Sequence, residues 1–245
     1  MIALTQTAFG DASGWALALQ GFYDVVPTIF FMLGSILLLR EFYSRMVKGN
    51  YALLAAGSIM VFSAGVLKAL HKIIMGLARV DYVILDRQFA PTQSIGFALL
   101  FVAMIGKFTP YNISHFDKQE TSRAPLIVLP LLAVLLADKI GDYNLPTYES
   151  TLPFIALMVI GALGFLIMLI IISCKMKKIP EVIFFILAKI MMFGMGCLST
   201  KRYFEGAWIQ ITVNLIYQLS FFLGCLLLMK HHIKEFDLFT KKNSK

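Results

Sequence analysis

Charged side chains are scarce in this sequence. Only 15% of the 245 residues are Asp, Glu, Lys or Arg, whereas 59% are hydrophobic, and the mean hydropathy is +0.79. A soluble domain carries about 25% charged residues, so this chain has too little polar surface to cover a globule in water. The composition predicts an integral membrane protein and excludes cytosolic enzymes, secreted disulfide scaffolds and disordered chains.

Cysteines and catalytic motifs are scarce as well. The three cysteines, Cys174, Cys197 and Cys225, are scattered along the chain, and only Cys197 falls near the predicted outer side, so we expect neither a disulfide nor a metal site. The sequence contains no Ser-His-Asp set and no phosphate-binding glycine loop. It therefore predicts no catalytic residue, no metal and no cofactor, and favours a protein that is not an enzyme.

Long apolar runs are what the sequence has in abundance. A helix needs about 20 mostly apolar residues to cross the hydrocarbon core of a bilayer. Seven such runs are present, so we expect an all-α, polytopic membrane protein built as a bundle of seven transmembrane helices. The runs are Phe22–Leu39, Tyr51–Leu77, Gln88–Phe108, Ala124–Ile140, Leu152–Cys174, Glu181–Ser199 and Ala207–Met229.

These runs divide the chain into three parts. We expect a short outer N-terminal segment over 1–21, a transmembrane domain over 22–229 and a basic cytoplasmic tail over 230–245. The N-terminal segment contains an apolar stretch of its own, which leaves open an eighth membrane element. No soluble domain is expected, so any function has to lie within the bundle or at its rims.

Lys and Arg are distributed unequally between the two ends of the predicted helices. Fourteen of the 22 fall after the first, third, fifth and seventh runs, seven fall on the other side, and Lys189 lies within the sixth run. Because cytoplasmic loops are enriched in Lys and Arg, we expect an outside N-terminus and a cytoplasmic C-terminus, in a plasma membrane or a bacterial inner membrane. A basic surface facing anionic lipids of the inner leaflet explains the net charge of +8 without a nucleic-acid partner.

Ionisable residues within the predicted spans are the candidates for function, since a charge at membrane depth costs about 2.5 kcal/mol or more. Lys68, His71 and Lys72 have the i, i+3, i+4 spacing that puts them on one face of the second span. Two neighbouring ammonium groups repel, so this face should point toward carboxylates, an anionic ligand or water. Asp24 and Asp138 are the candidate counter-charges.

A second polar face runs along the seventh span, where Gln210, Asn214, Tyr217 and Gln218 are spaced as on one side of a helix. Lys189 lies near the middle of the sixth span, where its ammonium group is too deep to reach the interface. It must therefore pair with an acid, contact a cavity or be neutral.

These residues also have interpretations without a ligand. Lys68 and Lys72 could extend to an outer interface if the second span ends near Val66 and residues 73–78 form an interfacial turn. Asp24 could lie at the interface, and the polar face of the seventh span could form hydrogen bonds between helices.

The hypothesis that these observations favour is a multi-pass membrane protein that binds a small anionic or amphiphilic ligand in an outward-opening intramembrane pocket, as a carrier or a sensor. One alternative is a membrane-embedded, lipid-modifying enzyme with His71 or Asp24 as general base, although no nucleophile is evident. Another is a non-catalytic subunit that binds a membrane-protein partner. The expected ligand-binding residues are Asp24, Lys68, His71, Lys72, Lys189, Asn214, Tyr217 and Gln218.

Overall fold

The chain forms long helices throughout the part that the structure describes. The computed structural model describes residues 14–43, 46, 48–108, 152–198 and 204–231, and within these ranges it contains six helices and no strand. Five of the six are long and apolar enough to cross a membrane, judged by length and composition. The chain is therefore a helical, multi-pass integral membrane protein. The helices are α1 (Gly14–Phe42), α2 (Lys48–Ala78), α3 (Val83–Phe108), α5 (Leu152–Lys175), α6 (Ile179–Leu198) and α7 (Phe204–Lys230).

The predicted all-helical class is confirmed, and each described helix corresponds to one predicted run. The predicted fourth run, Ala124–Ile140, lies outside the described residues. The prediction of a seventh helix therefore stays a prediction. Helix α1 begins at Gly14, well before Phe22, so the end of the expected N-terminal segment is continuous with the first span. Helix α2 is continuous to Ala78, so residues 73–78 belong to the same helix as Lys68 and Lys72.

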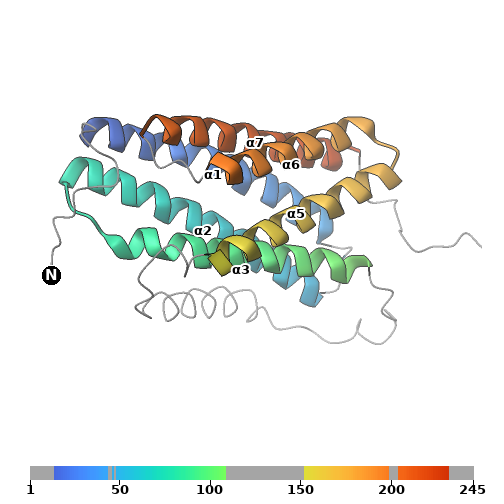
Figure 1. The fold of residues 1–245 in the computed structure, drawn as a ribbon. Coiled ribbons are helices and arrows are strands. Elements are labelled where there is room, and N and C mark those ends of the chain that lie inside the picture. The colour runs from blue at the N-terminus through green and yellow to red at the C-terminus, as the bar shows by residue number, and fades with distance from the viewer. Residues whose placement is uncertain (1–13, 44–45, 47, 109–151, 199–203, 232–245) are drawn as a thin grey trace, which may run out of the picture.

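The six described helices form a closed ring in which each packs against two others. Helix α1 contacts α2 and α7, α3 contacts α2 and α5, and α6 contacts α5 and α7. Figure 1 shows α6 and α7 along one side of the bundle and α2 and α3 along the other, with α1 and α5 joining the two sides. The centre of this ring is where interior side chains from different helices meet.

Two neighbouring pairs of helices run in the same direction. Tyr23 packs against Trp208 near the beginnings of α1 and α7, and Phe30 packs against Phe222 further along both helices. Gly161 and Gly164 of α5 lie against successive turns of α3 in the same way. Helices α1 and α3 both pack antiparallel to α2, to which short connections join them. Helices α1, α3, α5 and α7 therefore all end at the same end of the bundle.

Four phenylalanines meet at the centre of the ring and are referred to below as the phenylalanine layer. Phe31 stacks on Phe221 with ring centroids 5.5 Å apart and meets the edge of Phe97 at 6.2 Å. Phe165 lies 5.9 Å from Phe221. All four side chains are buried. Since aromatic pairs contribute about 0.5 to 1.5 kcal/mol beyond their buried area, this layer ties α1, α3, α5 and α7 together.

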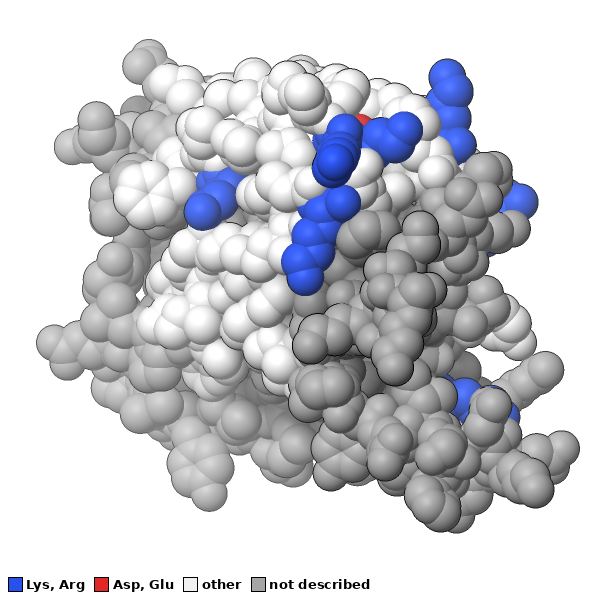
Figure 2. Space-filling model, turned by 90° about the vertical axis from the view of Figure 1, so that its right-hand side faces the viewer, with Lys and Arg blue, Asp and Glu red and all other residues white. Residues whose placement is uncertain are grey.

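The end at which α1 finishes is strongly basic and is referred to below as the basic end. Figure 2 shows this end of the bundle, where Lys and Arg are spread over the described part of the surface and little of that part is acidic. Two described acids of this end, Glu41 and Glu181, are buried, and Glu181 contacts His231. Burying these carboxylates leaves the described part of this surface more basic than the sequence indicates. The exposed cations are Arg40, Lys48, Lys175, Lys177 and Lys230.

Glycines set the close approach of α2 to α3. A Cβ atom on Gly57 would lie 2.6 Å from the backbone oxygen of Gly96, a distance that ordinary contacts do not reach. A Cβ atom on Gly96 would in turn meet Val61 at 2.7 Å. Small residues allow such backbone contact between membrane helices, where van der Waals packing is a main source of stability.

We predict that Gly57→Ala separates α2 from α3 and lowers the free energy of unfolding by about 1 to 3 kcal/mol. The matched control is Gly49→Ala in the same helix, because a Cβ atom there would meet nothing within 4 Å. Unfolding of the purified variants in detergent micelles measures the difference. Equal stability of the two variants would contradict the close packing of α2 on α3.

Candidate functional site

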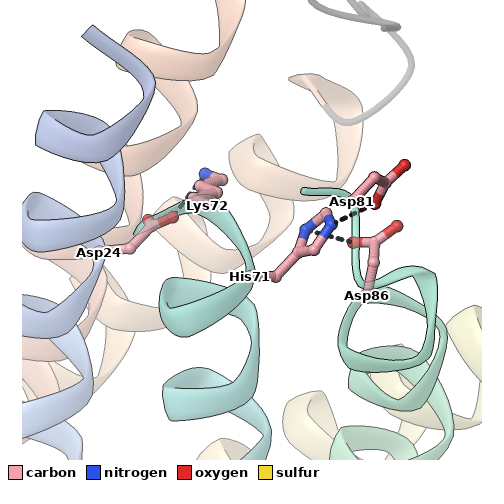
Figure 3. A network of polar contacts seen from close by, with 5 residues as sticks. All are labelled: Asp24, His71, Lys72, Asp81 and Asp86. Carbon is pink, nitrogen blue, oxygen red and sulfur yellow. Dashed lines mark hydrogen bonds and ion pairs between the residues drawn. The ribbon is translucent and has the colours of Figure 1, made fainter. Parts of the chain in front are cut away.

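Asp24 and Lys72 form an ion pair in the interior between α1 and α2. The Nζ atom of Lys72 lies 2.5 Å from Oδ2 of Asp24, and the two side chains are 10% and 7% exposed. Figure 3 shows the carboxylate and the ammonium group directed toward each other from the two helices. Gly21 and Gly65 allow α1 and α2 to approach closely on either side of this contact. Each charge therefore has its partner inside the chain.

His71 points to a different partner at the turn between α2 and α3. Its Nε2 atom lies 2.9 Å from Oδ1 of Asp81, and its Nδ1 atom lies 4.0 Å from Oδ1 of Asp86 (Figure 3). Arg79 has a positive φ of 56°, which reverses the chain directly after α2. The short turn brings Asp81 back to α2 within reach of His71. Sequence reasoning missed both aspartates as partners, although the shortness of the turn was a usable signal.

Lys68 lies one turn before Lys72 but has a third kind of partner. Its Nζ atom lies 4.6 Å from the centroid of the Phe89 ring on α3. Within the described ranges, it makes no ion pair with a carboxylate. The three basic side chains that the spacing places on one face of α2 therefore have three different environments. Lys72 meets a carboxylate on α1, His71 meets a carboxylate at the turn, and Lys68 meets an aromatic ring on α3.

A set of uncharged polar groups is buried without hydrogen-bond partners in the same part of the bundle. Gln20 is 0% exposed, and both atoms of its amide lack a partner within the described residues. It lies four residues before Asp24 and therefore on the same face of α1. Sequence reasoning missed Gln20 because it precedes the predicted first span. The other described side chains of this kind on α3 and α7 are Thr92, Gln93 and Gln218.

The polar groups lie on one side of the phenylalanine layer. Gln218 is three residues before Phe221 on α7, and Gln93 is four residues before Phe97 on α3. Asp24 precedes Phe31 by two helical turns on α1. Because these three helices run in the same direction, their polar groups lie between the layer and the end at which α1 begins. This region is the polar half of the interior.

The α7 residues expected at the site belong to this polar half. Tyr217 and Gln218 are buried, and Asn214 is half-buried. The contact between Trp208 and Tyr23 brings the beginning of α7 beside α1 next to Asp24. The structure therefore places the polar face of α7 along the same interior as the ion pair.

Lys189 is the expected site residue for which the described part of the structure shows no ion pair and no contact with α1 or α2. Phe185 of α6 packs against Gly224 of α7, and the two helices are antiparallel. Lys189, one turn after Phe185, therefore lies beside α7 near Ser220, at the level of the phenylalanine layer. It is half-buried and has no ion pair with a described residue.

The chemistry available to this arrangement is binding by charge and hydrogen bonds. Among the described residues, no three His, Cys, Asp or Glu side chains lie close enough together to hold a metal ion. The groups available for binding are the Asp24–Lys72 ion pair, the ammonium group of Lys68 and several amides and hydroxyls. A buried polar group without a partner costs about 1 to 3 kcal/mol, so a polar occupant that supplied the missing hydrogen bonds would be stabilised.

We predict a non-additive effect on stability at the ion pair. Asp24→Asn or Lys72→Met alone should lower the free energy of unfolding by about 3 to 5 kcal/mol, because each leaves one buried charge without a partner. The double variant should lose much less than the sum of the two single losses, because no charge remains. Denaturant unfolding in micelles gives the three values, and additive losses would show that the residues do not interact.

Comparison with known proteins leaves the function to be inferred from these contacts. No protein-family model, no curated protein and no solved structure matches the chain.

Proposed function

We propose that this multi-pass membrane protein binds a small anionic or amphiphilic ligand in the polar half of its interior, as a carrier or a sensor. The observation that carries the proposal is the fully buried amide of Gln20, which has no hydrogen-bond partner among the described residues and lies one turn from the Asp24–Lys72 ion pair. Burying an amide without a hydrogen bond is unfavourable, and a polar ligand in this position would remove that cost. The additional cation, Lys68, favours an anionic ligand.

The proposed site differs in part from the one expected from the sequence. Gln20 is added to it, and the groups on α1, α2 and α7 remain. His71 has its own acidic partner at the turn, and Lys189 lies on α6, which packs on α5 and α7, so we assign both to other roles. The proposed ligand-binding residues are Gln20, Asp24, Lys68, Lys72, Asn214, Tyr217 and Gln218.

A non-catalytic subunit of a membrane complex is the second candidate, and Lys189 supports it. This lysine has no acidic partner among the described residues and lies on a helix that exposes Ile186, Ile190 and Phe193. An apolar helix face with one half-buried cation fits a partner helix that carries a carboxylate, because pairing neutralises both charges within the membrane.

We further propose seven crossings, with the N-terminus outside and the C-terminus in the cytoplasm of a cell bounded by a plasma or bacterial inner membrane. Helices α3 and α5 run in the same direction, which supports one more crossing between them. The concentration of exposed cations at the basic end (Figure 2) supports a cytoplasmic position for it, next to anionic lipids of the inner leaflet.

Native mass spectrometry of the purified protein tests the binding function. We expect a defined anionic molecule to accompany the wild-type chain and to be lost from Gln20→Leu and from the double variant Lys68→Ala/Lys72→Ala. The control is Lys189→Met, which removes a charge on α6 at the level of the phenylalanine layer and should retain the molecule. Loss of a protein partner from Lys189→Met, with only bulk lipid on the wild type, would favour the subunit instead.

Labelling of Cys174 tests the orientation, because this cysteine is exposed at the basic end. In a chain with Cys197→Ser and Cys225→Ser, a membrane-impermeant maleimide should modify Cys174 only after the cells are permeabilised. In the same background with Cys174→Ser added, Val80→Cys at the opposite end should be labelled in intact cells. The reverse pattern would show that the basic end is outside.

A further inference from the structure

Lys68 is the one cation of the α2 cluster that the described residues leave without an acidic partner. Lys72 is paired with Asp24 at 2.5 Å, and His71 lies 2.9 Å from Asp81. Lys68 contacts the ring of Phe89. A cation–π contact of this kind contributes about 0.5 to 2 kcal/mol but does not neutralise the charge of the ammonium group. The polar half therefore holds one lysine that forms no ion pair with a described carboxylate.

This charge belongs to the same cluster as the ion pair. Lys68 interacts electrostatically with Asp24, Lys72 and Asp86. Asp24 already forms an ion pair with Lys72. Asp86 is exposed and lies in the first turn of α3, near His71. Adding a second cation beside a satisfied pair is unfavourable in the interior unless something negative accompanies it.

The hydrogen-bonding groups beside this charge define a second requirement. The amide of Gln20 offers one acceptor and two donor hydrogens, all without partners within the described residues. Gln20 lies on the face of α1 that carries Asp24, which Lys72 contacts from α2. An anion at Lys68 with a neutral polar group near Gln20 would satisfy both residues, and Phe89 supplies an apolar surface beside the anionic group.

We propose that Lys68 is the residue that binds the anionic group of the ligand, and that the ligand is a monoanion, a carboxylate or a phosphodiester, with an apolar or aromatic part. The Asp24–Lys72 pair then positions α1 against α2 and is not the counter-charge of the anion. This inference rests on the proposed binding function. Such a monoanion has two sources, a water-soluble acid or an amphiphile from the bilayer.

The test measures the thermal stability of the full chain in nanodiscs of phosphatidylcholine, whose lipids carry no net charge. Benzoate is the probe for a water-soluble acid, and oleate is the probe for an amphiphile. A ligand that binds the folded state raises the melting temperature in proportion to the logarithm of its concentration. We expect one probe to stabilise the wild type, and Lys68→Met to need about tenfold more of it, or more still, for the same shift.

Two further variants keep the result interpretable. Lys68→Arg retains the charge and should restore the response to the probe, which separates loss of the anion contact from a general change in packing. Arg87→Met removes an exposed cation of α3 at the same end of the bundle and should respond as the wild type does.

The remaining outcomes separate the two proposals. If the wild type responds but Lys68→Met responds equally, and the double variant Asp24→Asn/Lys72→Met does not respond, the anion binds Lys72 and the inference about Lys68 is wrong, whereas the binding function stands. If the wild type responds to neither probe, the anion-binding function fails, and the inference fails with it.

Discussion

The constraint on which this structure depends is that a charge inside the bundle needs a partner, because lipid cannot hydrate it. The ion pair of Asp24 with Lys72 joins α1 to α2, and the contact of Glu181 with His231 joins α6 to the end of α7. Such contacts neutralise charge and also determine which helices are neighbours. In the polar half, Lys68 forms no ion pair with a described carboxylate, and the proposed function therefore depends on this residue.

The phenylalanine layer gives the interior two chemically different halves. Toward the end where α1 begins, the buried groups include Gln20, Asp24 and Gln218, whereas toward the basic end the core consists mainly of side chains such as Leu38 and Leu169. A carrier must expose its site to both sides in turn, so the rings would have to separate.

The sequence supports prediction unevenly along the chain. Continuous apolar runs predict helices well, because backbone polar groups in lipid must be satisfied within the helix. Helical spacing also places Lys68, His71 and Lys72 near one another, and Asp24 could be proposed as a counter-charge from its depth. Gln20 could not be found in this way, because it precedes the predicted first span and its burial depends on α1 starting at Gly14.

The sequence by itself determined that the chain is helical and lies in a membrane, since composition and run length decide both. Only the tertiary structure decided that Lys72 meets Asp24, that His71 meets Asp81 and that Lys68 has no carboxylate among the described residues. The physical reason is that helical periodicity defines a face but not the helix packed against it. The order of helices around the ring, set by close contacts at glycines and by the phenylalanine layer, determines which side chains meet.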